Sequence, residues 1–280
     1  MRWLTKLHTL NQRWLYLATA MLLVLPLLVR VPVPSSGASG ATRGLYDAID
    51  SCPPGKVVMI NSNWDMGSRA ECEAQLDCVV RHLCRKRTRF VVTSVGLVFG
   101  PMFAEKVIRP IAREHGYRYG RDWVNCGYIQ ASGGLGVVVD GLCRDFHRVR
   151  PADANGTPIA KLPLMDRVRT VRDIHMVYCV GYAPEREWIS FVNGQHGTPV
   201  GFGCMSIMAP EYYTFLDSGQ LCGVLVGNRG SSEYEALLGR PGLGSRLIMV
   251  ASFGNCAILA AAVLGNVGMW AAERKRRQAR

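Results

Sequence analysis

Short apolar runs alternate with amphipathic segments through the middle of the chain. The apolar runs are rich in β-branched residues and lie at residues 56–61, 89–95, 123–129, 174–180 and 199–205. Between them, residues 68–87, 102–115, 134–146 and 184–193 have the apolar spacing or the turn signals of helices. Strands that are apolar throughout and alternate with helices are typical of a parallel sheet covered on both faces. The sequence therefore predicts an α/β fold with a doubly wound, mainly parallel sheet of about five strands, Rossmann-like or flavodoxin-like.

Two uncharged apolar runs, residues 14–29 and 247–272, flank this α/β region. A helix needs about 20 mainly apolar residues to cross a bilayer core, so the second run is long enough and the first is marginal. The first run also has the layout of a secretory signal peptide, with basic residues before it and SSGASGA after it. The first run can therefore be an uncleaved membrane anchor or a cleaved signal peptide. The anchor is favoured because Arg30 can extend the span by snorkelling.

Three regions follow from this pattern. Residues 1–34 are predicted to be a cytoplasmic tail and transmembrane anchor (or signal peptide), residues 35–245 the α/β domain, and residues 246–280 a transmembrane helix with a basic tail. Lys and Arg beside membrane spans are retained in the cytoplasm. Because basic residues precede the first run and ERKRRQAR follows the second, we expect a cell-membrane protein with both ends in the cytoplasm. The central domain is then extracytoplasmic, either periplasmic or extracellular.

The net charge of +12 invites a nucleic-acid interpretation. Residues 1–13 carry +3 and residues 273–280 carry +4, which leaves +5 for the rest of the chain. The densest remaining basic cluster, at residues 81–89, ends a predicted helix, where cations suit the helix dipole. We therefore interpret this cluster as a solvated helix end and expect no nucleic-acid binding.

The ten cysteines do not form the pattern of a disulfide framework or a zinc site. Several lie in apolar strand-like runs, where a free thiol behaves as a small hydrophobe, and no C-x-x-C or H-x-x-x-H pair occurs. One or two isolated bridges stay open, with Cys52 the most available partner. The chain also lacks a P-loop, a G-x-G-x-x-G fingerprint and a G-x-S-x-G elbow. No metal and no cofactor are predicted.

Polar residues near the ends of the predicted strands are the candidate ligand-binding groups. Parallel sheets bind ligands outside the carboxyl ends of their strands. The candidates are Asn61, Asn63, Asp65, Ser68, Ser94, Glu211, Tyr212, Ser218 and Gln220. Asp65 suits a nucleophile, a general base or a metal ligand, but Asp65 or Ser68 also suits a cap for the following helix. The cap is the favoured interpretation, and no catalytic residue is assigned.

The segment DSGQLCGVLVGNRGSSEYEALL, residues 217–238, places Gly219, Gly223 and Gly227 at four-residue spacing. Because apolar residues interleave with them, the three glycines are predicted to share one face of a short, closely packed helix. Residues 232–235 (SEYE) then match a capping box at the start of a second helix, with Glu235 as the capping glutamate. Glu233 is left without a role.

Six short segments along the chain resemble a known group of proteins. They are VVMINSNW (57–64), RHL (81–83), YGRDWVNCGY (119–128), MAPEYY (208–213), SGQLCG (218–223) and EYE (233–235). In this order they resemble an uncharacterised prokaryotic family of membrane-tethered, Rossmann-like α/β proteins, over most of residues 45–240. The family has no assigned activity, so the resemblance implies a tethered α/β domain and no functional residues.

The second apolar run carries small residues at a regular spacing. Ala257, Ala261 and Gly265 recur every four residues, which lets helix backbones approach closely in a membrane. The expected partners are therefore the lipid bilayer and a second copy or another membrane-complex subunit that packs on these residues. The expected function is a non-catalytic binding or assembly module. The alternative is a membrane-bound enzyme that acts on a polar or phosphorylated small molecule at the strand ends.

Overall fold

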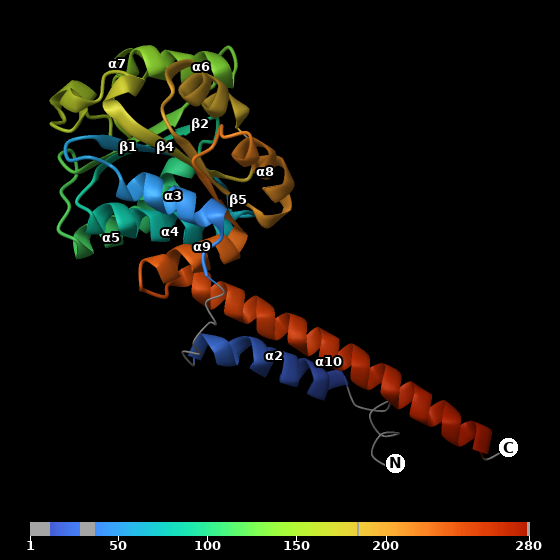
Figure 1. Ribbon diagram of the computed structural model, residues 1–280. Helices are drawn as coiled ribbons and strands as arrows, with labels where there is room; N and C mark the ends of the chain where they lie inside the picture. The colour runs from blue at the N-terminus through green and yellow to red at the C-terminus, as the bar shows by residue number, and fades with distance from the viewer. Residues whose placement is uncertain (1–11, 29–36, 184, 279–280) are drawn as a thin grey trace. The chain divides into compact units, whose positions relative to one another are not determined.

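The computed structural model describes residues 12–28, 37–183 and 185–278. By its internal contacts the chain divides into two units, residues 35–245 and the terminal segments 1–34 and 246–280. The larger unit contains a six-stranded sheet in the order β3-β2-β1-β4-β5-β6, and every neighbouring pair is parallel (Figure 1). This is the strand order of a doubly wound, Rossmann-type sheet.

The first five strands confirm the predicted runs to within two residues at each end. Their bounds are β1 Val57–Asn63, β2 Arg89–Val95, β3 Trp123–Ile129, β4 Ile174–Gly181 and β5 Val200–Cys204. Almost every residue in them is buried, which agrees with a sheet that has helices on both faces. The sixth strand, β6 Gly223–Val226, was not predicted.

Helices cover both faces of the sheet (Figure 1). Those on one face are α3 Gly40–Asp50, α4 Arg69–Arg85, α5 Gly100–Glu114 and α9 Gly227–Leu237. Those on the other face are α6 Leu135–Arg144, α7 Phe146–Val149, the π-helix η4 Trp188–Gly194 and α8 Ala209–Asp217. Short 3-10 helices fill connections, namely η1 Ile159–Lys161, η2 Met165–Arg167, η3 Val171–Asp173 and η5 Ser206–Met208. The predicted α/β architecture is confirmed.

The helix predicted across Gly219 to Gly227 is wrong, because residues 223–226 form strand β6 beside β5. A run of four apolar residues fits a strand or a buried helix equally well, and here pairing with β5 decides. Gly223 still serves close packing, as predicted, but against α3. A Cβ at this position would overlap the Leu45 amide and lie 2.7 Å from the Ala41 carbonyl oxygen.

Two helices lie where the sequence predicts none. Helix α3 begins inside the segment SSGASGA that follows the first apolar run, and the Ser39 side chain caps it by accepting from the Thr42 amide. Helix α8 contains the candidates Glu211 and Tyr212, which were expected only to follow the end of a strand. Glycines lower the helix propensity of α3, but burial of its Leu45 and Ile49 against the sheet outweighs that cost. The helix predicted at 184–193 starts at a residue outside the described ones and continues as η4.

The sequence Glu233-Tyr234-Glu235 in α9 fastens three other parts of the larger unit. Glu233 accepts hydrogen bonds from the Ser39 amide at 3.0 Å and the Thr42 hydroxyl at 2.9 Å, so it holds the start of α3. Buried Tyr234 makes a 2.7 Å hydrogen bond between its hydroxyl and His82 Nδ1 on α4. These contacts give Glu233 the role that the sequence left open.

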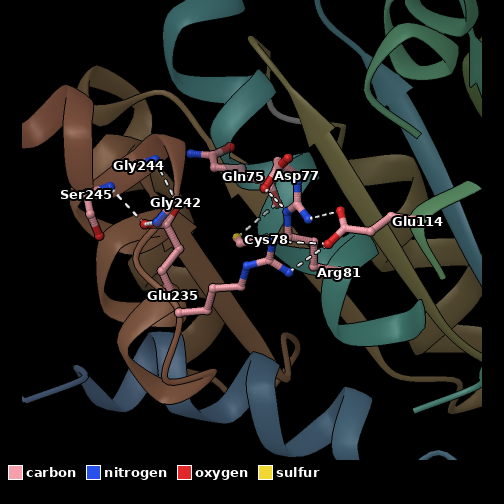
Figure 2. Close-up of polar contacts among 10 residues, drawn as sticks. Gln75, Asp77, Cys78, Arg81, Glu114, Glu235, Gly242, Gly244 and Ser245 are labelled. Atoms are coloured by element: carbon pink, nitrogen blue, oxygen red, sulfur yellow. Dashed lines mark hydrogen bonds and ion pairs between the residues drawn. The ribbon is translucent and has the colours of Figure 1, made fainter. Parts of the chain in front are cut away.

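Glu235 is a helix cap, but not the one predicted. Helix α9 begins at Gly227, so Glu235 lies in its last turn and not in a capping box. Its buried carboxylate accepts from the amides of Gly242 at 2.7 Å, Gly244 at 2.8 Å and Ser245 at 2.9 Å (Figure 2). These amides belong to the start of α10, Leu243–Gln278, where an anion suits the helix dipole.

The start of α10 lies at the amino edge of the sheet, where the strands begin. Arg85, at the end of α4, donates to the carbonyl oxygen of Leu238 at 2.9 Å. Glu114, at the end of α5, pairs with Arg240 at 3.0 Å and with Arg81 at 2.9 Å; Figure 2 shows Arg81 between Asp77 and Glu114. Helices that follow parallel strands run back to the amino edge, so residues 238–245 are fixed there.

The basic cluster at residues 81–89 was predicted to be a solvated helix end, but several of its side chains bind other parts of the larger unit. His82 is buried between Tyr234 and Asp50, and burial lowers its pKa to about 4. Lys86 pairs with Asp50 at 3.3 Å, and Arg87 donates to the His115 carbonyl oxygen at 2.7 Å. These side chains join helix ends at the amino edge instead of facing only water.

One helix among the described residues is long and apolar enough to cross a membrane. It is the stretch Leu243–Ala271 of α10. Helix α2, Gln12–Leu28, has 17 described residues and falls short of that length, so the expected pair of flanking transmembrane helices is reduced to one candidate. In the terminal unit, Leu23 of α2 lies close to Gly254 of α10, since a Cβ there would be 3.1 Å from the leucine Cδ2.

The Glu235 cap predicts a stability loss that an exposed carboxylate would not cause. Glu235→Ala leaves three amides at the start of α10 without their acceptor, which costs about 3 kcal/mol. For a unit of this size the melting temperature should fall by roughly 6–12 °C. Glu73→Ala, which removes an exposed ion pair with Arg69, should cost less than about 1 kcal/mol. Circular dichroism of the full chain in nanodiscs measures both melting temperatures. Equal melting temperatures for the two variants would contradict the cap.

The close approach of α3 to β6 predicts opposite effects for two glycines. Gly223→Ala places a methyl group against the α3 backbone, and such overpacking costs about 1–3 kcal/mol. Gly40→Ala, in the first turn of α3, meets no atom within 4 Å and should be neutral or slightly stabilising. Urea unfolding of the two variants measures the difference, and a harmless Gly223→Ala would refute the close contact.

Candidate functional site

The strand order reverses at the centre of the sheet, between β1 and β4. The chain leaves β1 towards α4 on one face and leaves β4 towards η4 on the other. In an open parallel sheet, ligands bind outside the carboxyl ends of the strands at this reversal. The carboxyl ends of β1 and β4 are therefore the position where a ligand site is expected.

A buried hydrogen-bond network occupies this position. Glu185, in the loop after β4, accepts from the side-chain amides of Asn61 and Asn63 at 2.5 Å each, one on each carboxyl oxygen. The Asn63 amide also donates to the Val95 carbonyl oxygen, and its own side-chain oxygen accepts from the Ser94 hydroxyl. Three of the predicted candidates, Asn61, Asn63 and Ser94, thus meet around a residue that was not among them.

Glu185 is the one buried acid at the carboxyl edge in the described residues, with 7% of its surface exposed. Burial raises its pKa to about 8, against the opposing effect of the hydrogen bonds from Asn63 and Asn61. A carboxyl group with a pKa near neutrality can give or take a proton under physiological conditions. Perturbed acids of this kind are concentrated at functional sites.

The network also fastens the loop after β4 to two neighbouring strands. Asn61 accepts from the Val95 amide at 3.2 Å, so one asparagine joins the end of β2 to Glu185. Asn63 does the same through the carbonyl oxygen of Val95. A site on these residues would be held rigidly, since every side chain of the network is bonded to at least two partners.

Asp65 and Ser68 confirm the structural interpretation that the sequence favoured. The Asp65 carboxylate accepts from the amides of Gly67 at 2.9 Å and Ser68 at 3.1 Å, and from the Ser68 hydroxyl at 3.0 Å. These bonds, the backbone bond from Ser68 foremost, lower the pKa of Asp65. The carboxylate is used to close the turn before α4, and it does not join the Glu185 network.

The other four candidates lie elsewhere. Glu211 pairs with Arg186 at 2.5 Å on the surface of the same edge. Tyr212 is buried against Phe202 and donates to the Ala183 carbonyl oxygen at 3.1 Å, so it supports the loop that carries Glu185. Ser218 and Gln220 are exposed between α8 and β6, at the amino edge. This placement corrects the expectation that they contribute to a strand-end cleft.

Glu185 escaped the sequence analysis because its surroundings resemble an ordinary helix start. The segment Pro184-Glu185-Arg186-Glu187 alternates charges, which is typical of a solvated first turn. The usable signal is its position four residues after the end of β4, at the strand next to β1. Only the pairing of β4 with β1 shows that this acid meets Asn61 and Asn63.

Exposed apolar side chains follow the strands at the same edge as the network. We define the apolar rim as Met66, Val98, Phe99, Tyr182 and Ile207, which follow β1, β2, β2, β4 and β5. Their exposure ranges from 45% for Tyr182 to 77% for Ile207. The remaining exposed large apolar residues described within residues 35–245 lie in α5, α6 and α8, which begin at the same edge: Met102, Val137 and Tyr213.

The thiols give no sign of redox or metal chemistry at this edge. All ten cysteines are described and free, and eight of them are buried. Burial raises the pKa of Cys179, the thiol nearest to Asn61 and Glu185 in the network, well above its usual value. No group of three or more His, Cys, Asp or Glu side chains in the described ranges is arranged to hold a metal ion.

The raised pKa of Glu185 predicts a pH dependence of stability. Because its folded-state pKa lies near 8 and the unfolded value near 4.5, its contribution is complete below about pH 4.5 and is lost as pH rises to 8. Glu185→Gln has no ionisable group at this position, so its stability does not fall with pH through this residue. The unfolding free energy of the variant minus that of the native chain should therefore rise by about 1.4 kcal/mol per pH unit from pH 5 to 8.

Comparing Glu185→Gln with the native chain separates the pH dependence due to Glu185 from that due to His82, which has the opposite sign. His82 has a folded pKa of about 4, so its contribution is complete above about pH 6.5 and is lost as pH falls towards 4. Both proteins retain His82, and its effect cancels in the difference. Parallel pH profiles of melting temperature for Glu185→Gln and the native chain would show that the carboxyl group is already ionised at pH 5.

Comparisons with known proteins add no family or relative. No protein-family model matches this sequence. No curated protein matches it significantly. The resemblance to an uncharacterised family of tethered α/β proteins therefore stays a prediction, and function has to be argued from the site itself.

Proposed function

We propose that this protein is a membrane-anchored, extracytoplasmic binding module whose α/β domain takes a small ligand at the carboxyl edge of its sheet. The observation that carries the proposal is the Glu185 network at the reversal of strand order, with the exposed apolar rim on loops of the same edge. Ligand sites combine apolar surface with a few polar groups in fixed positions. The carboxyl edge has both.

The anchor is assigned to α10, whose stretch Leu243–Ala271 has the length and composition of a membrane span. Helix α2 is proposed as a second, shorter anchor or as part of a signal sequence. The basic residues before α2 and at the end of the chain place both ends in the cytoplasm in this proposal. The larger unit is then outside the cytoplasm.

The position of the anchor's first turn supports an accessible ligand edge. Glu235 holds residues 242–245 at the amino edge, and the Glu185 network lies at the carboxyl edge. The two features are thus at opposite ends of the strands. Residues 242–245, which lead into α10, therefore do not cover the residues proposed to bind the ligand.

The small residues of α10 support association with another span. A Cβ at Gly265 would meet no described atom within 4 Å, so this position has room for the close approach of another helix. We propose that Ala257, Ala261 and Gly265 contact a second copy or another subunit of a membrane complex. This contact would bring several α/β domains together.

An enzyme is the second candidate, and the pKa of Glu185 is what favours it. A carboxyl group with a pKa near 8 suits a general acid or base that acts on a bound polar molecule. In that case Glu185→Gln would abolish turnover and leave ligand binding in place. If the protein is only a binding module, neither the native chain nor the Glu185→Gln variant would convert the bound molecule.

The binding function predicts that the chain purifies with a bound small molecule. We expect native mass spectrometry of the full chain, extracted into nanodiscs from its own membrane, to show an added mass. Ile207→Asp puts a charge on the apolar rim and should lower the occupancy at least tenfold. Gln220→Asp puts the same charge at the amino edge and should leave it unchanged. A native chain without an added mass, or equal occupancy in both variants, would sink the proposal.

The topology predicts opposite labelling of two introduced cysteines in intact cells. The native thiols of the α/β domain are poor reporters because nearly all are buried, so the probes are Ser218→Cys in the domain and Arg277→Cys in the tail. A membrane-impermeant maleimide should label the first and reach the second only after lysis. Labelling of Arg277→Cys alone in intact cells would show the opposite topology.

A further inference from the structure

We propose that the ligand of the carboxyl edge is an uncharged amphiphile, with a hydrogen-bonding head group at the Glu185 network and an apolar chain on the apolar rim. The inference rests on the proposed binding function and names the class of molecule that the site takes. Three features of the larger unit support it, namely the distribution of exposed apolar side chains, the pairing of basic side chains and the neutrality of the network.

Exposed apolar side chains are confined to one edge of the larger unit. Every exposed large hydrophobic residue described between residues 37 and 245 lies in a loop or helix that begins at the carboxyl edge. Single exposed apolar residues scattered over a surface need no explanation, but a group on one side marks an interaction site. An apolar chain on Ile207, Val98 and Phe99 would cover surface that otherwise faces water.

Among the described residues, the loops and first helical turns of this edge contain no basic side chain without an acidic partner. Three basic residues occur in its loops and first helical turns, and each is paired with an acid: Arg69 with Glu73, Arg186 with Glu211 and Arg229 with Glu233. The amides before α4 are also used, since Asp65 accepts from them. A phosphate or carboxylate is normally held by Arg or Lys or by free amides at a helix start. At these three arginines and at the amides before α4, an anionic ligand would therefore have to break existing contacts.

The polar centre of the site is neutral as well. Burial keeps Glu185 largely protonated at pH 7, and its partners Asn61, Asn63 and Ser94 carry no charge. A head group with hydroxyl or amide groups can exchange hydrogen bonds with such a centre. A cationic head group would favour ionised Glu185, which burial disfavours.

The source of such a ligand is the bilayer to which α10 is proposed to attach the domain. Amphiphiles partition into membranes, and a tethered domain meets them at a high effective concentration. A protein partner is a different occupant of the same rim. A protein surface could cover the rim without using the buried network at the same edge, so the network favours the amphiphile.

The test uses a monoacylglycerol that carries a diazirine in its acyl chain. The full chain in nanodiscs is irradiated with this probe, and the labelled peptides are mapped by mass spectrometry. We expect saturable labelling of the rim loops at residues 96–102 and 205–208. Unlabelled monoacylglycerol should compete at least tenfold better than a fatty acid or a lysophosphatidic acid with the same chain. Labelling of α10 by bulk lipid is the internal reference.

Matched variants separate the site from general partitioning. Val98→Asp should reduce the labelling of the rim loops at least tenfold and leave labelling of α10 unchanged, whereas Ser218→Asp at the amino edge should change neither. Labelling of α10 alone, or better competition by the anionic lipids, would overturn the inference. If native mass spectrometry then still finds a bound molecule of another class, the binding function stands and only the ligand class is wrong. Protection of the rim by a cross-linked protein would also overturn it.

Discussion

The parallel sheet must bury both faces, and most of the structure follows from that constraint. Its strands are apolar on both sides, so each needs a helix or another core segment above and below it. The contact between β6 and α3 shows how tight this covering is, because Gly223 and Gly44 have no room for a side chain. Buried polar groups need partners, and two clusters of them are paired at the two edges of the sheet.

At the amino edge the polar contacts are structural. Helix α9 uses Glu233 to hold the start of α3 and Glu235 to hold the start of α10. Because α3 follows the N-terminal segment and α10 is the candidate membrane helix, one short helix fastens both ends of the domain. Ion pairs among Arg81, Glu114 and Arg240 add to this junction.

At the carboxyl edge the polar contacts are unfavourable enough to suggest a function. Burying Glu185 shifts its pKa towards 8, and that shift is a loss of stability at neutral pH. A purely structural network could use a neutral amide at the same position. Residues that lower stability in this way and lie where parallel sheets bind ligands are typical of functional sites. The apolar rim around Glu185 gives the same edge a surface that favours association.

The sequence by itself determined the elements with strong periodicity. It predicted β1 to β5, the helices α4 to α6, the covering of both faces and the apolar stretch of α10, because each depends on local patterns of burial. It also brought Asn61, Asn63 and Ser94 into one group, since strand ends converge in any parallel sheet. The tertiary structure alone decided that GVLV pairs with β5 as a strand, that Glu235 caps α10, and that Glu185 meets two asparagines. The pairing of GVLV and the Glu185 network depend on contacts between residues more than 20 positions apart, which no local pattern records. The Glu235 cap depends on where α9 begins and on the turn that brings α10 back to its end.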